Sequence, residues 1–170
     1  MLLLCETGGW IKHCTEVFPF FAPTVNSYKR FVSASWAPTK CAWSYDNRTA
    51  GFRIVGSGQS LRIEYRVCGA DINPYLAFAA SLAAGLDGIE NEIDPSLPLD
   101  GNVYDATDGD FKSIPTSFAQ SIEQFKESMW ANDTFGEDVV KHYAHFYELE
   151  RKCHEAAVSD WERMRYFEMI

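Results

Sequence analysis

The sequence predicts an α+β fold in which helices flank an antiparallel curved sheet and the last third of the chain is helical. Residues 39–45, 50–55 and 61–67 alternate apolar and polar side chains, and the last two stretches flank glycine-containing turn residues, which is typical of half-buried strands joined in a hairpin. Residues 73–86 are rich in Ala and Leu and begin with Asn-Pro, a pair that starts helices. From residue 116 onward, apolar residues recur at helical spacing.

The strongest local pattern is a hairpin over residues 50–67. Its strands flank the turn sequence Gly-Ser-Gly-Gln. Since side chains alternate between faces, one face is apolar and is predicted to lie against the core. A four-residue turn predicts that Arg53 lies opposite Arg62 and that Gly51 lies opposite Glu64. The predicted inward residues are Ala50, Phe52, Ile54, Leu61, Ile63, Tyr65 and Val67.

The outward face of the hairpin carries Arg53, Arg62, Glu64 and Arg66. Like charges directly opposite each other in a ladder are destabilising unless counter-charges or a bound anion lie nearby. Guanidinium groups match phosphate and carboxylate oxygens, and a Glu carboxylate suits a hard divalent ion. The pattern therefore indicates a site for an anion together with a metal ion. A solvated strand face linked by salt bridges is the alternative.

Two elements are predicted before the hairpin. Residues 9–18 have helical spacing, which Pro19 ends. Residues 1–8 carry no clear signal and are left unassigned. A strand is expected over residues 39–45, with one face formed by Cys41, Trp43 and Tyr45.

After the hairpin, the chain is predicted to be mostly helical. The helix over residues 73–86 is apolar nearly all round, which indicates a buried helix. Residues 92–115 contain several Pro and Gly residues and are predicted to be a long loop. Further helices are expected over residues 116–130, 136–158 and 159–170, the last one starting with a capping box of Ser159 and Glu162.

Bulk composition restricts the possible partners. The 170 residues suffice for one domain with a hydrophobic core. The net charge of −9 argues against nonspecific binding to nucleic acid or to an anionic membrane, so neither is expected as a partner. The five cysteines are scattered and form no CxxC pair, which indicates reduced thiols and a cytoplasmic location.

Several long motifs follow one another along the chain: NSYKRF at residues 26–31, APT at 37–39, DNRTAGFRI at 46–54, RIEYR at 62–66 and GADINPYLAFAASLAAGLDGIEN at 69–91. Together they resemble the C-terminal part of the catalytic domain of the glutamine synthetase family. The resemblance runs from about residue 9 to the C-terminus. It implies that residues 1–170 form the C-terminal portion of that domain, that the sheet is part of a larger barrel, and that the family's N-terminal β-grasp domain is absent.

The resemblance also implies roles for three arginines that contact substrate. Arg30 corresponds to an arginine that grips the glutamate substrate. Arg48 corresponds to one that lies near the glutamate and the γ-phosphate of ATP. Arg66 corresponds to a residue that stabilises γ-glutamyl phosphate.

Three further positions correspond to nucleotide and metal contacts. Arg53 and Arg62 match arginines that contact the phosphates of ATP, although the loop before Arg62 is shorter than in typical members and lacks a lysine found there. Glu64 matches a ligand of Mg²⁺ or Mn²⁺. The resemblance thus implies ATP and a divalent metal ion as cofactors.

One departure from the family pattern concerns the amine substrate. Members that use ammonia carry a glutamate at the position that aligns with Trp36. An indole cannot act as a base at neutral pH, and it offers an aromatic surface to a larger amine. The SWAP sequence here resembles the loop of γ-glutamyl-polyamine and γ-glutamyl-ethanolamine synthetases. Simple packing of the tryptophan in its loop is the alternative.

The resemblance implies an ATP-dependent γ-glutamyl amide ligase that joins glutamate to an amine or ammonia, within a homo-oligomer. The family's other metal-binding glutamates are not found in the chain. We therefore expect the isolated chain to be inactive, and its open sheet edge to favour poor solubility or association with a partner. A non-catalytic structural or interaction protein that retains the fold is the alternative.

Overall fold

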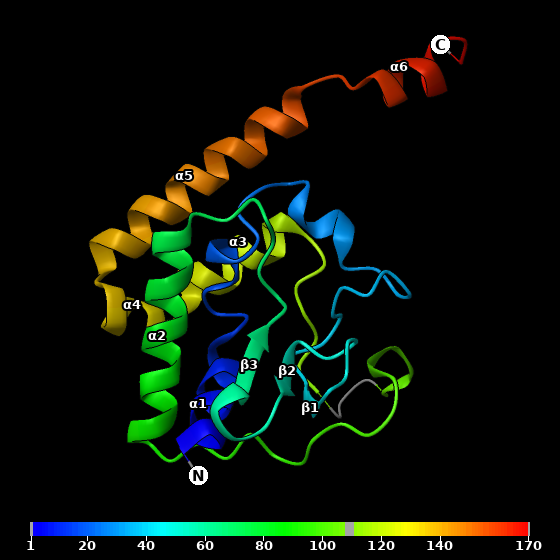
Figure 1. Ribbon diagram of the computed structural model, residues 1–170. Coiled ribbons are helices and arrows are strands. Elements are labelled where there is room, and N and C mark those ends of the chain that lie inside the picture. The colour runs from blue at the N-terminus through cyan, green and yellow to red at the C-terminus, as the bar shows by residue number, and fades with distance from the viewer. Residues whose placement is uncertain (1, 108–110, 170) are drawn as a thin grey trace.

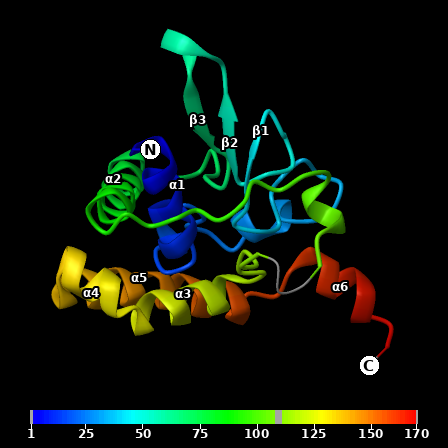
Figure 2. The ribbon, with the colours of Figure 1, turned by 90° about the horizontal axis from the view of Figure 1, so that it is seen from below.

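The computed structural model describes residues 2–107 and 111–169. Helices α1 and α2 lie side by side, the β2–β3 hairpin projects on one side of them, and α3, α4 and α5 form a helical layer on the other side (Figures 1 and 2). The helices are α1 Leu2–His13, α2 Pro74–Glu90, α3 Phe118–Glu127, α4 Met129–Phe135, α5 Glu137–Ala156 and α6 Asp160–Tyr166. The strands are β1 Trp43–Tyr45, β2 Phe52–Val55 and β3 Arg62–Tyr65, and the 3-10 helices are η1 Phe18–Phe20, η2 Ser27–Arg30, η3 Gly58–Ser60 and η4 Val103–Asp105.

The sheet is mixed, with its three strands in the order β1-β2-β3. β2 and β3 are antiparallel, as predicted, but β1 runs parallel to β2 with Trp43 opposite Phe52. The prediction of a wholly antiparallel sheet is therefore wrong. The loop over residues 46–51 returns the chain to the start of β1, where the Phe52 amide donates to Ala42 O at 3.1 Å. Alternation in the sequence could not reveal the strand direction, because side chains alternate in both kinds of ladder.

The register of the hairpin differs from the predicted one by two residues. Arg53 lies opposite Glu64 instead of Arg62, because η3 lengthens the turn. The Ser60 hydroxyl closes η3, since its Oγ accepts from the Ser57 amide at 3.1 Å and donates to Ser57 O at 2.9 Å. A shift of two residues leaves every side chain on its predicted face. It also replaces a like-charge pair with an opposite-charge pair, which stabilises a ladder.

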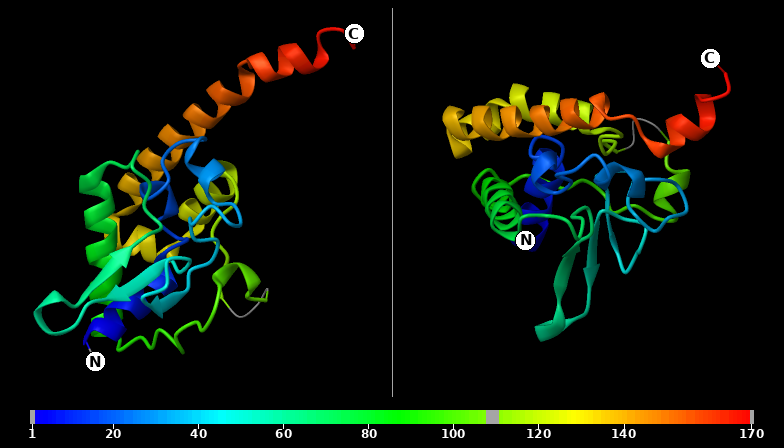
Figure 3. Two further views of the ribbon diagram at one scale, coloured as in Figure 1. Left: turned by 45° about the vertical axis from the view of Figure 1, so that its right-hand side comes forward. Right: turned by 90° about the horizontal axis from the view of Figure 1, so that it is seen from above.

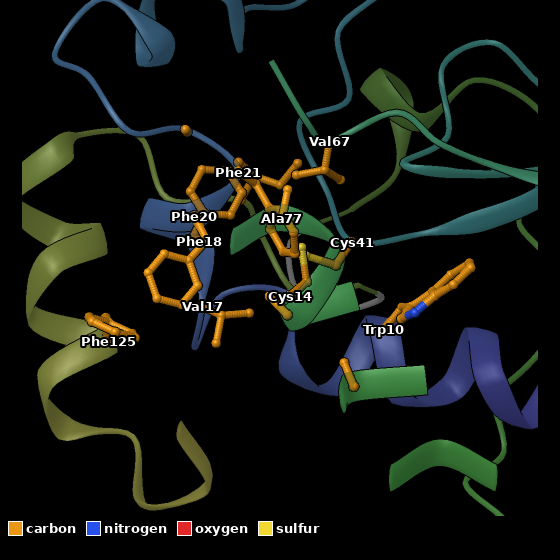
Figure 4. Packing of buried hydrophobic residues seen from close by; sticks show 14 of the residues in the cluster. Trp10, Cys14, Val17, Phe18, Phe20, Phe21, Cys41, Val67, Ala77 and Phe125 are labelled. Atoms are coloured by element: carbon orange, nitrogen blue, oxygen red, sulfur yellow. The ribbon is translucent and has the colours of Figure 1, made fainter. Parts of the chain in front are cut away.

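Phenylalanine side chains fill much of the core, as the close view of the cluster shows (Figure 4). Phe18 and Phe21 follow α1 and are fully buried together with Phe52 of β2 and Phe125 of α3. The predicted inward face of the hairpin is confirmed for the residues that precede the turn. Leu61 is an exception, since it is 47% exposed at the end of the lengthened turn.

α1 and α2 approach each other closely through glycines. A Cβ atom on Gly9 would lie 2.0 Å from Ala84 O, and one on Gly88 would lie 2.1 Å from Cys5 O. Only glycine permits this contact, because any side chain would overlap the facing backbone. The small residues therefore fix the spacing between the two helices.

The boundaries of α1 and α2 differ from those predicted. α1 begins at Leu2, so the helix takes up residues 2–8 that the sequence left unassigned, and it ends before residue 18. α2 starts as predicted, since the Asn73 side chain caps the Tyr75 amide and Pro74 follows it. However, α2 is buried on one face only. Its opposite face exposes Tyr75, Phe78, Leu82 and Leu86, so the prediction of burial nearly all round is wrong for this chain.

The C-terminal third is helical, as predicted. The expected helix over residues 116–130 is divided at Ser128, which ends α3 and caps α4. The capping box of Ser159 and Glu162 is confirmed at the start of α6. α5 and α6 extend beyond the rest of the molecule (Figure 3). Residues 108–110 of the predicted loop lie outside the described residues. Within the described part of the chain, no helix has the length and apolar character needed to cross a membrane.

Candidate functional site

The centre of the candidate site is the Glu64 carboxylate on β3. Arg53 on the neighbouring strand donates from Nη1 to Glu64 Oε2 at 2.9 Å, and Arg62 Nη2 lies 3.5 Å from Glu64 Oε1. The hydrogen bond from Arg53 lowers the pKa of Glu64, and the charges of Arg62 and Arg66 add to this effect. Glu64 is therefore held as a carboxylate among cations.

Asp46 is a second acidic partner of Arg53. Arg53 donates from Nη2 to Asp46 Oδ1 while its Nη1 binds Glu64. Both bonds raise the pKa of Arg53, and the bond to Glu64 has the larger effect. Asp46 has a φ of 46°, a left-handed conformation that Asp adopts more readily than most residues. The parallel pairing of β1 with β2 places it there, because Ser44 lies opposite Arg53. The two carboxylates fix the orientation of the guanidinium group.

Arg66 joins two loops beside the end of β3. Its Nη2 donates to Trp36 O at 2.8 Å and to Arg48 O at 2.6 Å. The loop with Trp36 is held in an uncommon conformation, since Ala34 and Trp36 have φ angles of 65° and 63°. The indole itself is exposed. Arg66 therefore positions the Trp36 loop through its backbone.

Arg30, at the end of η2, holds the chain that leaves β3. Its Nη1 donates to Val67 O at 2.7 Å and its Nη2 donates to Arg66 O at 2.8 Å. Its guanidinium carbon is 4.6 Å from the centre of the Phe31 ring. Burial lowers the pKa of Arg30. Both terminal nitrogens are thus used to hold backbone, which the sequence did not predict.

The six residues singled out in the sequence fall into two groups. Arg53, Arg62, Glu64 and Arg66 share the outward face of the hairpin, where all three arginines contribute to the lowered pKa of Glu64. Arg30 and Arg48 connect to this face only through backbone atoms next to Arg66, and the Arg48 side chain is exposed. The described structure brings the first group together and places the second at its edge.

Two donors of this cluster are suited to an anion. The Nε atoms of Arg53 and Arg66 are buried and have no hydrogen-bond partner among the residues that the structure describes. An unpaired buried donor is costly, and a phosphate or carboxylate oxygen is the natural acceptor for guanidinium. The residues present therefore fit an anionic ligand such as the phosphates of ATP.

The same residues do not by themselves fit a divalent metal ion. Mg²⁺ is normally held by several oxygen ligands, and Glu64 offers a single carboxylate that is already paired with arginines. Among the described residues, no group of three or more potential ligands is close enough to hold a metal. Glu64 could supply one ligand of a site whose other ligands come from elsewhere.

Sequence reasoning missed two features of the site. Asp46 stands directly before the Asn-Arg of the DNR motif, but only the parallel strand pairing brings it to Arg53. The Trp36 carbonyl also escaped notice, because backbone acceptors leave no mark in the sequence. The signal available for Asp46 was an acidic residue at the end of an alternating strand.

Comparisons with known proteins agree with the motifs. The family model for the glutamine synthetase catalytic domain matches residues 2–166. The chain is 47% identical over 163 residues to the gamma-glutamylethanolamide synthetase GlnA4 of Streptomyces coelicolor, covering 96% of this chain and 35% of that protein. It is 39% identical over 164 residues to the glutamate–isopropylamine ligase of a Pseudomonas species, covering 96% and 36%.

A solved structure is similar over the same length. The complex of GmaS with ADP has a TM-score of 0.85 and 30% sequence identity, covering 98% of this chain and 40% of the GmaS chain. The 170 residues therefore span between a third and two fifths of these proteins. The match of nearly the whole chain to one family model shows that this chain belongs to the glutamine synthetase family, within its catalytic domain.

Proposed function

We propose that this chain is the C-terminal catalytic portion of an ATP-dependent γ-glutamyl amide ligase. The observation that supports this most is the arginine cluster around Glu64, in which the buried Nε donors of Arg53 and Arg66 have no partner within the described part of the chain. Such donors suit the negative charge that develops during phosphoryl transfer. The names of its relatives, which are ligases that join amines to glutamate, support the same reaction class.

The proposed reaction has two steps. The γ-carboxylate of glutamate attacks the terminal phosphorus of ATP, which gives γ-glutamyl phosphate and ADP. An amine then attacks the acyl carbon, phosphate leaves, and the amine loses a proton to give the amide. Both steps depend mainly on positioning and charge neutralisation.

In this proposal the arginines bind and neutralise phosphate. Arg53 and Arg62 bind the phosphates of ATP, and Arg66 neutralises the acyl phosphate through Nε while Nη2 keeps the Trp36 loop in place. Glu64 supplies one ligand for Mg²⁺ or Mn²⁺, which would screen the charge between the phosphates. The acidic partners of Arg53 hold its guanidinium in place before the nucleotide arrives.

Arg48 and Arg30 serve the glutamate substrate in this proposal. Arg48 accepts a hydrogen bond from Arg66 through its own backbone carbonyl, and its side chain is exposed. That side chain is therefore available near the cluster. Arg30 already uses both terminal nitrogens on backbone carbonyls. Contact between Arg30 and glutamate therefore requires its Nε or a rotation of the guanidinium group.

The amine in this proposal is larger than ammonia. Trp36 is 63% exposed, and its backbone carbonyl is bound by Arg66. An apolar ring in this position can contact the carbon part of an amine or a protonated amine group. The relatives named for ethanolamide and isopropylamine products support this choice.

We also propose that the 170 residues cannot complete the reaction alone. Glu64 is the one metal ligand that this proposal takes from the described residues, and the chain matches about a third of the relatives' length. Full activity would need the rest of the family's catalytic domain and the homo-oligomer expected of the family. Turnover of ATP, glutamate and an amine by the purified chain would refute this part of the proposal.

Calorimetric titration of the purified chain with ATP and Mg²⁺ tests the anion site. We expect weak binding that Arg53→Ala and Glu64→Ala both reduce. Arg163→Ala is the matched control, since Arg163 is an exposed arginine on α6 far along the chain from the cluster. Equal binding by the Arg53 variant and the Arg163 variant would remove the site from the proposal. No binding by any form would favour a non-catalytic relative that retains the fold.

A further inference from the structure

The Trp36 loop is held at two consecutive carbonyl groups. Arg66 donates to Trp36 O at 2.8 Å, and the hydroxyl of Tyr104 on η4 donates to Ala37 O at 2.8 Å. Ala37 is only 9% exposed, so its carbonyl has little access to water. A buried carbonyl needs a donor, and here the donor comes from a residue 67 positions later in the chain.

Two bound carbonyls in a row set the direction of the Trp36 side chain. A peptide group is planar, so a bond to its carbonyl fixes the orientation of the whole plane. The plane with Trp36 O begins at the Trp36 Cα atom, and the plane with Ala37 O is the next one along the chain. Trp36 has a φ of 63°, which is unfavourable for a residue with a side chain. The two hydrogen bonds therefore hold a conformation that the loop does not favour by itself.

η4 is itself fixed to the loop over residues 46–51. Val103 of η4 is fully buried, and its amide donates to Thr49 Oγ1 at 3.1 Å. Directly before η4, Asn47 Nδ2 donates to Gly101 O at 2.7 Å. η4 therefore presents its tyrosine hydroxyl from an anchored backbone.

These contacts close a ring of hydrogen-bonded segments. Arg66 also donates to Arg48 O at 2.6 Å, and Arg48 lies in the loop that anchors η4. The ring runs from Arg66 through the Arg48 loop to η4, from Tyr104 to Ala37 O, and back through Trp36 O to Arg66. The loop that carries the indole is thus joined to two loops of the candidate site, and the Tyr104 hydroxyl makes the join on one side.

We propose that Tyr104 is a positioning residue that sets the preference for the amine through Trp36. Its hydroxyl holds Ala37 O and thereby orients the exposed indole of the preceding residue. This inference rests on the proposed function, in which the Trp36 ring contacts the carbon part of the amine. An ordered ring lowers the cost of binding such an amine. Ammonia has no carbon part, so it gains nothing from the order of the ring.

Fluorine NMR of the isolated chain tests the contact without requiring activity. The five tryptophans are replaced with 5-fluorotryptophan, and Trp36→Phe assigns the Trp36 signal. Tyr104→Phe keeps the aromatic ring and removes only the hydroxyl. It should shift or broaden the Trp36 signal, while the signal of the buried Trp10 stays in place and shows that the fold is intact.

Tyr45→Phe is the matched control. Tyr45 is 60% exposed at the end of β1, so this variant loses the same hydroxyl from a side chain that water reaches. It should leave the Trp36 signal unchanged. A Trp36 signal that is the same in Tyr104→Phe and in the wild type would overturn the inference.

Kinetics test the consequence for the substrate. In a chimaera, these 170 residues replace the matched segment of the Streptomyces coelicolor gamma-glutamylethanolamide synthetase. Tyr104→Phe should raise the KM for isopropylamine about fivefold or more and leave the KM for ATP and for glutamate unchanged, because only the amine meets the Trp36 ring. The kcat/KM ratio of isopropylamine to ammonia should fall by a similar factor. A residue that only stabilises the fold would lower the activity with both amines equally.

A double-mutant cycle shows whether Tyr104 acts through Trp36. In a chimaera that carries Trp36→Ala, Tyr104→Phe should no longer change the kcat/KM ratio of the two amines, because the ring that Tyr104 orients is gone. An equal change of that ratio with and without the ring would overturn the inference.

The outcomes separate this inference from the proposed function. A changed Trp36 signal in the isolated chain, with no turnover by the chimaera, would support the hold of Tyr104 on the Trp36 loop and contradict the ligase proposal. Turnover by the chimaera with a KM for isopropylamine that Tyr104→Phe does not change would support the ligase proposal and overturn the role of Tyr104.

Discussion

At the scale of single residues, the pair Arg53 and Glu64 carries most of the electrostatics of the site. The sequence placed both residues on one face of a hairpin, and this is confirmed, although the pairing differs by two residues. The length of a turn that contains 3-10 helix could not be read from the Gly-Ser-Gly pattern. Charge favoured the observed register, since it sets a carboxylate opposite a guanidinium. A preference for opposite charges across the ladder would therefore have predicted the observed register.

The ionisation of Glu64 should depend on Arg53. Because the hydrogen bond from Arg53 is the main cause of the lowered pKa of Glu64, Arg53→Gln should raise that pKa toward the ordinary glutamate value. NMR titration of the side-chain carboxyl carbons would measure it. Arg163→Gln changes the net charge by the same amount but lies on α6, far from the site, so it should leave the pKa of Glu64 unchanged. The same pKa in both variants would show that Arg53 does not govern Glu64.

At the scale of elements, a buried histidine joins α1, α2 and α4. His13 is 1% exposed at the end of α1. Its Nδ1 is 2.5 Å from Glu16 Oε2, its Nε2 is 2.8 Å from Asp87 Oδ2 on α2, and its ring stacks on Trp130 of α4 at 3.8 Å. Ser128, which caps α4, donates to Glu16. Each ring nitrogen of His13 therefore faces one carboxylate, which ties the three elements together.

This junction should make stability fall at acid pH. Burial alone would raise the pKa of Glu16 and Asp87, but hydrogen bonds and charge from His13 outweigh burial and lower both. The stabilisation is thus present above the ordinary values of 4.5 and 3.8 and is lost as the pH falls through the lowered ones. Between pH 5 and pH 3, the free energy of unfolding should fall more steeply for the wild type than for His13→Gln.

Urea denaturation at a series of pH values would measure this difference. At pH 6, His13→Gln should lower the free energy of unfolding by about 1–3 kcal/mol, because it leaves the partly buried carboxylates of Glu16 and Asp87 without their imidazole partner. His142→Gln on α5 is the control with a similar change in composition and should have little effect. Parallel pH profiles for the wild type and His13→Gln would contradict the role of the junction.

The contact between α1 and α2 makes a second prediction at this scale. Gly9→Ala should destabilise the protein by about 1–3 kcal/mol, because its Cβ atom would meet Ala84 O at 2.0 Å and backbone cannot yield cheaply. Gly85→Ala is the matched control on α2. Its Cβ atom would meet Glu6 Cγ at 2.9 Å and Trp10 Nε1 at 3.1 Å, which are side-chain atoms that can shift more easily than backbone. Thermal unfolding followed by circular dichroism should show a larger fall in Tm for Gly9→Ala than for Gly85→Ala.

At the scale of the whole molecule, local patterns were predictable and non-local pairing was not. Capping residues and helical spacing predicted α2, α5 and α6, because both signals depend only on residues that are neighbours in the sequence. The parallel direction of β1 depends on contacts between distant segments, and so does the approach of Asp46 to Arg53. The exposed face of α2 was predicted to be buried because its composition matches a core helix, and only the three-dimensional arrangement shows which side the rest of this chain covers.

The proposed choice of amine can be tested only in a complete catalytic domain. In a chimaera in which these 170 residues replace the matched segment of the Streptomyces coelicolor gamma-glutamylethanolamide synthetase, Trp36→Glu would replace an apolar ring with a carboxylate that can accept a proton from ammonium. The ratio of kcat/KM for ammonia to that for isopropylamine should rise about tenfold or more. Val32→Glu adds the same charge to the same loop at a residue that is 52% exposed, and it should leave the ratio unchanged. If both variants shift the ratio equally, the added charge and not the position of Trp36 sets the preference for the amine.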